Sequence, residues 1–190
     1  CLKITAMGVY EAVVNGKRVG EYVLAPGWTS LKHRLEVQGY DITALMDIDN
    51  EIAVTVGKGW YRSPMPGWIT DEERAEKQNT PPGLLAEITV TYEDGETLLV
   101  MTGQDWTAAE SQVRFSEIYD GETYDASFVT SESQPVTEFD GRYDYLIPQQ
   151  GDEIREIEKI IPLSVFTAPN GETVIDFGQE VTGYISFEVE

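Results

Sequence analysis

The chain has 190 residues, of which 34 are Asp or Glu and 13 are Lys or Arg, so its formal net charge is −21 with the single histidine neutral. A charge this negative repels phosphate backbones and anionic lipid headgroups, which excludes nucleic-acid and membrane-surface binding unless a local basic patch exists. The sequence shows no such patch, since its densest positive run is Lys17, Arg18, then Lys32 and Arg34. Hydrophobic residues make up 41%, enough for the core of one domain and part of a second.

Cysteine usage and the first residues add further limits. The one cysteine, Cys1, allows neither an intrachain disulfide nor a thiolate metal cluster. No apolar run approaches the roughly 20 residues that a membrane-spanning helix needs. Residues 1–5 have the pattern of the middle of a strand, which predicts that the chain is part of a longer polypeptide and leaves its cellular compartment unknown.

The next element along the chain is a predicted hairpin. Residues 9–14 form its first strand, Asn15-Gly16 its turn and residues 17–19 the return strand, because Asn-Gly tolerates the positive φ angles of a tight primed turn. Further on, residues 41–45 predict one helical turn, and residues 51–56 predict a shorter strand.

A short helix is predicted in the middle of the chain. Thr70 and Glu73 have the spacing of a capping box, in which the Thr side chain and the Glu side chain satisfy each other's backbone amides. The pattern continues to residue 78, and Pro81-Pro82 ends the helix after about two turns.

A second hairpin follows this helix. Residues 84–92 alternate between apolar and polar side chains, which is typical of a strand with one buried and one wet face. The apolar side consists of Ala86, Ile88, Val90 and Tyr92. Residues 93–96 form the turn, and residues 97–102 form the return strand.

Many short strands separated by turn residues predict an all-β fold, a jelly-roll-like antiparallel β-sandwich with one or two short helical turns. The composition becomes polar at residues 149–153. We therefore expect residues 1–150 to form the sandwich. Residues 151–190, with strand candidates at 173–177 and 185–189, are expected to be a linker and the opening strands of a following β-domain, because they are too few to form a domain alone.

Two catalytic patterns can be set aside. A Ser-His-Asp site needs a histidine base, and the single histidine, His33, lies between Lys32 and Arg34 in a chain without a Gly-x-Ser-x-Gly motif, which favours a surface or packing role. Residues 57–62 begin like a dinucleotide fingerprint, but Arg62 occupies the position of the third glycine and no helix start follows.

The carboxylates raise the question of a metal site. Asp120, Glu122 and Asp125 place oxygen ligands along a turn, so they are candidate calcium ligands. Their spacing lacks the regular ligand ladder of a dedicated calcium loop, and a solvated turn is the alternative. The acidic residues 71–73 instead fit the exposed first turn of the predicted helix, where negative charge complements the helix dipole.

Aromatic residues in Gly- and Pro-rich loops are the strongest lead to a binding site. The candidates are Trp28, Trp60, Tyr61 and Trp68. Loop aromatics beside polar groups suit sugar recognition, because the apolar face of a pyranose ring lies flat on an indole while its hydroxyls bind neighbouring polar groups. The alternative is that these rings pack under loops or against a neighbouring domain.

The same loops carry a family likeness. The chain resembles the N-terminal β-sandwich of bacterial α-L-rhamnosidases at residues 8–11, 15–20, 24–29, 40–43, 57–62, 118–126 and 176–179, in this order. It departs from the family pattern at Glu180, where asparagine is usual, and at Ser127, where arginine is common. The order and extent of the matches make the resemblance specific.

The resemblance implies an accessory role. In these glycoside hydrolases an (α/α)₆ barrel beyond the β-domains cleaves terminal rhamnose with inversion, and no helical array of that kind is predicted here. No catalytic residue is therefore assigned, and this chain alone is expected to be inactive. Its expected partners are the catalytic barrel and β-domains and, through the whole enzyme, an L-rhamnose-containing glycoside.

Three interpretations remain open. The leading one is an accessory, non-catalytic sandwich that supports the barrel. The second is a calcium-assisted carbohydrate-binding module that uses Trp28, Trp60 and Tyr61 together with Asp120 or Glu122. The third is a purely structural domain whose exposed aromatics bury against the barrel.

Overall fold

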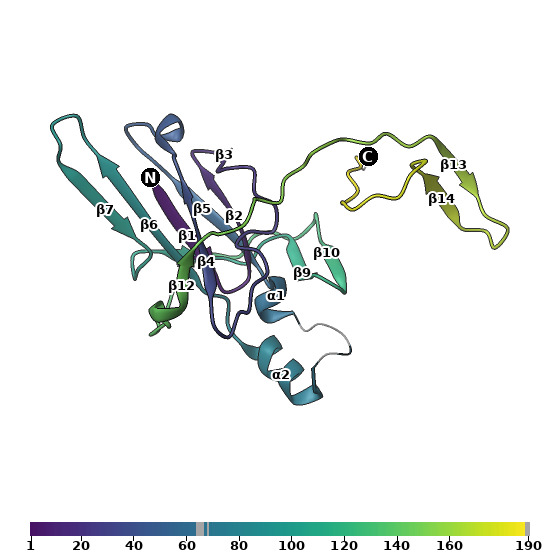
Figure 1. Cartoon of the computed structure of the whole chain (residues 1–190), viewed down its shortest axis with the longest axis horizontal. Coiled ribbons are helices and arrows are strands. Elements are labelled where there is room, and N and C mark those ends of the chain that lie inside the picture. The colour runs from purple at the N-terminus through teal and green to yellow at the C-terminus, as the bar shows by residue number, and fades with distance from the viewer. Residues whose placement is uncertain (64–66, 68, 189–190) are drawn as a thin grey trace. The chain divides into compact units, whose positions relative to one another are not determined.

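The computed structural model describes residues 1–63, 67 and 69–188 (Figure 1). The chain divides into two compact units, Cys1–Arg155 and Glu156–Glu190. Among the described residues, no helix combines the length and the apolar character that a membrane crossing requires.

Two larger sheets contain most of the strands described in the first unit (Figure 1). The larger has the strand order β12 (Leu146–Pro148), β4 (Leu35–Tyr40), β1 (Leu2–Ala6), β6 (Leu84–Thr91) and β7 (Thr97–Met101). The smaller has the order β3 (Lys17–Arg18), β2 (Val9–Val14) and β5 (Ile52–Gly57). All neighbouring strands are antiparallel except β12 and β4, which are parallel. The predicted all-β sandwich is thus confirmed.

Smaller elements connect these strands. Two short antiparallel pairs join β9 (Val113–Glu117) to β10 (Gly121–Tyr124) and β8 (Thr107–Ala108) to β11 (Gln134–Pro135). The helical elements among the described residues are two 3₁₀ turns, η1 (Thr43–Leu45) and η2 (Tyr143–Tyr145), and two α-helices, α1 (Gly59–Arg62) and α2 (Asp71–Asn79).

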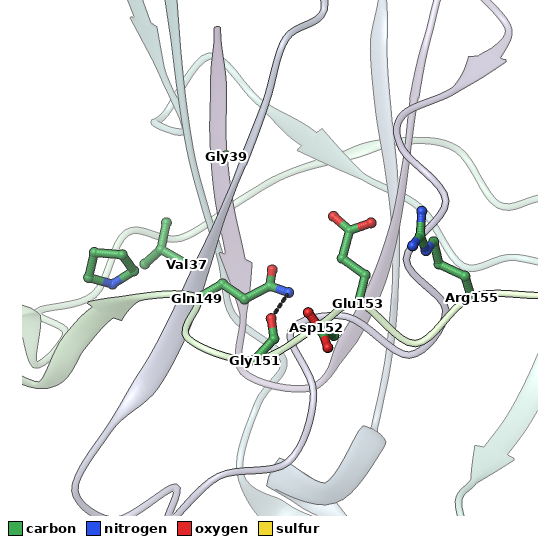
Figure 2. Close-up of a pocket in the computed structure, with 8 residues that line it drawn as sticks. Val37, Gly39, Gln149, Gly151, Asp152, Glu153 and Arg155 are labelled. Atoms are coloured by element: carbon green, nitrogen blue, oxygen red, sulfur yellow. Dashed lines mark hydrogen bonds between the residues drawn. The ribbon is translucent and has the colours of Figure 1, made fainter.

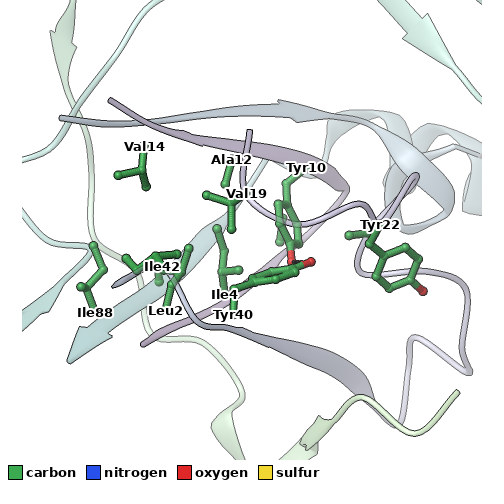
Figure 3. Packing of buried hydrophobic residues seen from close by; sticks show 13 residues of the cluster. Leu2, Ile4, Tyr10, Ala12, Val14, Val19, Tyr22, Tyr40, Ile42 and Ile88 are labelled. Carbon is green, nitrogen blue, oxygen red and sulfur yellow. Dashed lines mark hydrogen bonds between the residues drawn. The ribbon is translucent and has the colours of Figure 1, made fainter. Parts of the chain in front are cut away.

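The core lies between the two sheets, and strand alternation explains its composition (Figure 3). Leu2 and Ile4 of β1 pair with Ile88 and Ala86 of β6, so these four side chains share one face of the larger sheet. The smaller sheet contributes Tyr10, Ala12 and Val14 of β2, with Val56, Val54 and Ile52 of β5 opposite them in register. One apolar face of each sheet is therefore removed from water.

A polar network crosses this core. The Tyr10 hydroxyl donates to Gln38 Oε1 at 2.9 Å and lies 3.3 Å from the Tyr40 hydroxyl. Gln38 Nε2 donates to the Pro26 carbonyl at 3.4 Å, so this buried amide makes bonds on both sides. Burial, together with the Tyr40 hydroxyl, raises the pKa of Tyr10 well above its ordinary value.

Local signals in the sequence predicted several elements correctly. The Asn15-Gly16 turn has φ angles of 50° and 76° and joins β2 to β3. Thr70 caps α2, with its hydroxyl accepting from the Glu73 amide and the Glu73 carboxylate accepting from the Thr70 amide. The 84–102 hairpin is β6 and β7, although Tyr92, expected on the buried side, lies beyond the end of β6 and is half exposed.

Strand β7 is unusual because it is an edge strand with both faces open. Every residue of Thr97–Met101 is exposed, and four of them are the apolar run Leu98, Leu99, Val100 and Met101. One side of β7 pairs with β6, and no strand of the described chain pairs with its other side.

The described part of the second unit, up to residue 188, contains one hairpin, formed by β13 (Ser164–Thr167) and β14 (Thr173–Asp176). The strand expected at 173–177 is therefore confirmed. The strand expected at 185–189 is not formed over residues 185–188, where no described segment pairs with them, and residue 189 lies outside the described residues. Residues 151–155 pack in the first unit, since the Val23 amide donates to the Ile154 carbonyl at 2.7 Å. That 151–190 opens a further β-domain stays a prediction.

Candidate functional site

The structure brings two of the predicted aromatic residues into one stacked pair. Trp28 lies in the loop that precedes β4, and Trp60 lies in the first turn of α1. Their ring centroids are 6.2 Å apart and their planes differ by 11°, a spacing at which aromatic pairs attract each other. Trp28 is 61% exposed although it is a large aromatic residue, and Trp60 is half-buried beside it. The pair is therefore an aromatic surface open to solvent.

Close backbone packing fixes the position of Trp60. Helix α1 begins at Gly59, whose φ of 54° lies in the left-handed region. A Cβ at Gly59 would stand 2.6 Å from Val9 Cγ1 and 2.7 Å from the Val9 amide nitrogen, so only glycine fits against β2 here. Helix α2 also holds Trp60, since Lys77 Nζ donates to the Trp60 carbonyl at 3.2 Å.

A buried ion pair anchors the entrance to α1. Lys58 Nζ lies 2.6 Å from Glu117 Oε1 of β9, and the Glu117 side chain is only 2% exposed. The same ammonium stands 4.9 Å from the centroid of the Phe115 ring, a cation–π distance. Charge pairing of this kind is what makes burial of a carboxylate tolerable. The pair ties the residue before α1 to a strand 59 positions away.

Tyr61 points to a different neighbour than Trp60 does. Its hydroxyl lies beside that of Tyr145, whose pKa is raised by burial and by this contact. The Arg142 guanidinium stands 5.0 Å from the Tyr145 ring centroid, and it donates to the Lys32 carbonyl at 3.1 Å. Tyr61 is therefore half-buried under the 142–145 segment rather than part of an open platform with the tryptophans. Trp68, the fourth aromatic candidate, lies outside the described residues.

The predicted calcium ligands do not form a cluster. Asp120 lies in the turn between β9 and β10, Glu122 lies on β10, and Asp125 follows that strand. The Asp125 carboxylate accepts from the amide and the hydroxyl of Ser127, at 2.9 and 2.6 Å, which lowers the pKa of Asp125 and closes a local turn. Within the described ranges, no three His, Cys, Asp or Glu side chains are grouped so that they could hold a metal ion.

An open hollow of about 480 Å³ lies elsewhere on the first unit, between β4 and the segment that follows β12 (Figure 2). Its lining includes Val37 and Gly39 of β4 and the charged residues Asp152, Glu153 and Arg155. Figure 2 shows the Gln149 side chain donating to the Gly151 carbonyl, at 3.1 Å, on the rim. None of the predicted aromatic residues lines this hollow, so it is separate from the tryptophan pair.

Comparison with known protein families shows to which family this chain belongs. Residues 1–158 match the model of the alpha-L-rhamnosidase N-terminal domain. The chain belongs to this family. The match covers the whole sandwich, including both tryptophans and the β9–β10 hairpin. The resemblance seen in the sequence is therefore confirmed.

Full-length rhamnosidases contain this domain as a small part. The alpha-L-rhamnosidase of Alteromonas sp. (strain LOR) is 32% identical over 209 residues, covering 99% of this chain and 21% of the relative. The crystal structure of native alpha-L-rhamnosidase from Aspergillus terreus superposes with a TM-score of 0.84 at 35% identity, over 94% of this chain and 22% of that one. The Streptomyces avermitilis enzyme, solved in complex with L-rhamnose, gives 0.82 at 31% identity, over 94% and 18%. This rhamnosidase domain thus spans about a fifth of its relatives' length.

The sequence did not reveal several residues that contact Trp60, Tyr61 or Lys32 in this rhamnosidase domain. Lys77 was expected only as a helix residue, and Arg142 and Tyr145 carried no signal. Arg142 lies 110 positions from its partner Lys32, and contacts of that separation follow from sheet order, not from local pattern. The parallel pairing of β12 with β4 brings the 142–145 segment to this loop.

Proposed function

We propose that this chain is a non-catalytic, accessory β-sandwich of an α-L-rhamnosidase, a glycoside hydrolase that removes terminal α-L-rhamnose. The observation that carries the proposal is the family match over residues 1–158 in a chain that spans about a fifth of its full-length relatives. In this proposal the hydrolytic carboxylates belong to an (α/α)₆ barrel in the rest of the enzyme, which the sandwich supports.

The charges inside the sandwich are consistent with a supporting role. Inverting glycosidases need one protonated and one ionised carboxyl group facing each other across the scissile bond. Glu117, the one buried carboxylate in the described chain, is instead held by Lys58 at 2.6 Å. The carboxylate is thus already engaged by an ammonium group, so its role is to join β9 to α1.

The test compares the purified chain with the full-length enzyme on an aryl α-L-rhamnoside. We expect the full-length enzyme to release product and the 190-residue chain to release none at equal molar concentration. Turnover by the chain that persists through purification would overturn the proposal. As a second measurement, adding the chain to an enzyme lacking residues 1–155 should raise that enzyme's activity or melting temperature if the sandwich supports the barrel.

A second candidate function is carbohydrate binding, and the exposed Trp28–Trp60 pair favours it. Two near-parallel indoles offer apolar faces on which a sugar ring lies flat. Calorimetric titration with L-rhamnose, then with calcium and with EDTA, tests it. Saturable binding that Trp28→Ala removes would support this function, and loss of binding in EDTA would assign a role to Asp120 or Glu122. Silence at millimolar sugar in both conditions would reject it and leave the pair as a contact with another domain.

A further inference from the structure

The positive charges of this chain are unevenly distributed. Six of the 13 lysines and arginines form ion pairs with carboxylates in the part of the chain that the structure describes. Most of the others lie in two short stretches of the first unit: Lys32, Arg34, Arg62, Arg74 and Lys77. In a chain of net charge −21, cations without a carboxylate partner that gather in one region mark that region as different from the rest of the surface.

The fold brings these stretches to the tryptophan pair. Lys77 Nζ donates a hydrogen bond to the Trp60 carbonyl at 3.2 Å. The pKa of Lys77 is lowered first by burial and then by repulsion from the Lys32 charge. Arg142 joins them through its bond to the Lys32 carbonyl at 3.1 Å. We call Trp28, Trp60, Lys32, Lys77 and Arg142 the basic-aromatic cluster. The sequence alone showed no basic patch, because the cations of the basic-aromatic cluster come from three separate segments.

Nearby carboxylates compensate the two lysines only in part. The charge of Glu73 acts on both lysines, while its carboxylate also accepts from the Thr70 amide at 3.0 Å as part of the capping box. Asp144 pairs with Arg142 at 3.2 Å. In the described residues no carboxylate lies within ion-pair distance of Lys32 or Lys77, and the two lysines repel each other. An anion placed between them would relieve this repulsion.

We propose that the basic-aromatic cluster binds a sugar ring that carries an anionic substituent, a carboxylate or a sulfate. The ring lies against Trp28 and Trp60, and the anionic group is bound by Lys32 and Lys77. This inference rests on the proposed carbohydrate-binding function and narrows it to acidic glycans. An extended polyanion such as nucleic acid is disfavoured, because the net charge of −21 repels every phosphate beyond the cluster.

The test uses three sugars that differ only at C6: D-galactose, D-galacturonate and D-galactose 6-sulfate. Each is titrated into the 190-residue chain, and binding is followed by tryptophan fluorescence and by calorimetry. We expect both anionic sugars to bind roughly tenfold more tightly than D-galactose at low salt, as two partly exposed charge pairs allow. The difference should disappear at 0.5 M NaCl, where screening removes it. The ratio of the affinities for D-galacturonate and D-galactose 6-sulfate shows whether the site prefers a carboxylate or a sulfate.

Matched variants separate the contribution of the two lysines from that of the tryptophan pair. Lys32→Ala with Lys77→Ala should reduce the affinity for D-galacturonate to that for D-galactose, and Trp28→Ala should weaken binding of all three sugars. Lys17→Ala is the control, because Lys17 is also an exposed lysine that forms no ion pair with a described residue but lies in the β2–β3 hairpin. It should leave every affinity unchanged.

The possible failures have different meanings. Equal affinity for all three sugars would overturn the acidic preference and leave carbohydrate binding intact. No binding of any sugar would overturn both this inference and the carbohydrate-binding function, while the accessory role would still be judged by the activity assay. D-Galacturonate that binds equally well to Trp28→Ala and is displaced by inorganic sulfate would show an anion site without sugar recognition, which also rejects the inference.

Discussion

At the scale of single residues, the Lys58–Glu117 pair is the contact whose loss we expect to cost most. Glu117→Ala leaves a largely buried ammonium without its partner, and we expect it to lower the free energy of unfolding by about 2 kcal/mol, less than for a fully buried pair because Lys58 is 26% exposed. Urea unfolding followed by tryptophan fluorescence measures this, since all four tryptophans lie in the first 106 residues and report on the sandwich.

Two controls accompany this prediction. Lys3→Ala removes an ion pair whose side chains are 61% and 36% exposed, and it should change stability by no more than about 0.5 kcal/mol. Lys58→Met introduced into Glu117→Ala should recover part of the loss, because no orphan charge is left. If the double variant were less stable than Glu117→Ala by a further 2 kcal/mol, the charge argument would be wrong and packing would dominate.

The buried tyrosines predict a dependence on alkaline pH. The pKa of Tyr10 is raised in the folded chain, so above pH 10 the unfolded chain loses this proton while the folded chain keeps it. The stabilising contribution of Tyr10 is therefore complete below pH 10 and is lost as the pH rises, by about 1.4 kcal/mol per pH unit. Tyr22 and Tyr40, whose pKa values are also raised by burial, add to the same trend.

Tyr10→Phe isolates this effect. At neutral pH the variant should be less stable by about 1 kcal/mol, because Gln38 loses a hydrogen bond of 2.9 Å. Above pH 10 the urea midpoints of the two proteins should converge, since the phenylalanine has no proton to lose. Curves that stay parallel up to pH 11.5 would contradict the assignment of the alkaline loss to Tyr10.

At the scale of elements, helix α1 depends on one glycine. Gly59→Ala places a Cβ against the backbone and side chain of Val9 in a residue that also has a positive φ, and we expect it to cost about 3 kcal/mol and to disturb the Trp28–Trp60 pair. Gly121→Ala is the matched control, because its φ is +85° but no heavy atom lies within 4 Å of the added Cβ. It should cost about 1 kcal/mol and leave the near-ultraviolet circular dichroism of the tryptophans unchanged.

Local chemistry determined which elements were visible in the sequence. The Asn15-Gly16 turn and the Thr70–Glu73 capping box lie within four residues of the structure they specify, and both were predicted. Strand β12, with three residues, and α1, with four, carry no pattern of their own. They form because β4 offers an edge for pairing and Val9 offers a surface for packing, which are tertiary effects that a single sequence does not display.

At the scale of the whole molecule, the division into two units predicts where a protease cuts first. Residues 151–163 contain no strand or helix, and Lys159 is exposed among them, whereas Arg155 is engaged by Glu21. Limited trypsin treatment should therefore cleave after Lys159 and leave a sandwich fragment of 159 residues. Its urea transition, followed by tryptophan fluorescence, should coincide with that of the intact chain. A first cleavage inside the sandwich would show that the units are not separately stable.

The candidate site also depends on tertiary contacts that a single sequence does not display. The Gly- and Pro-rich context of Trp28 and Trp60 made them binding-site candidates in the sequence, and the structure stacks them. That they bind carbohydrate stays a prediction. The candidate calcium ligands Asp120, Glu122 and Asp125 are not grouped within the described residues, and the Asp125 carboxylate accepts from Ser127 instead. The cations beside the tryptophans were missed, since Lys32, Lys77 and Arg142 meet only after the sheets have formed.

The open edge of β7 has a consequence for how this protein behaves in solution. Its exposed run Thr97–Met101 can pair with the same strand of a second molecule, which is how sheet edges nucleate aggregates. The net charge of −21 keeps molecules apart at low ionic strength, but at 0.1 M salt this repulsion reaches only about 10 Å. Colloidal stability should therefore fall as salt is added, with the second virial coefficient turning negative. Dilute, low-salt buffer is the condition under which the monomer persists.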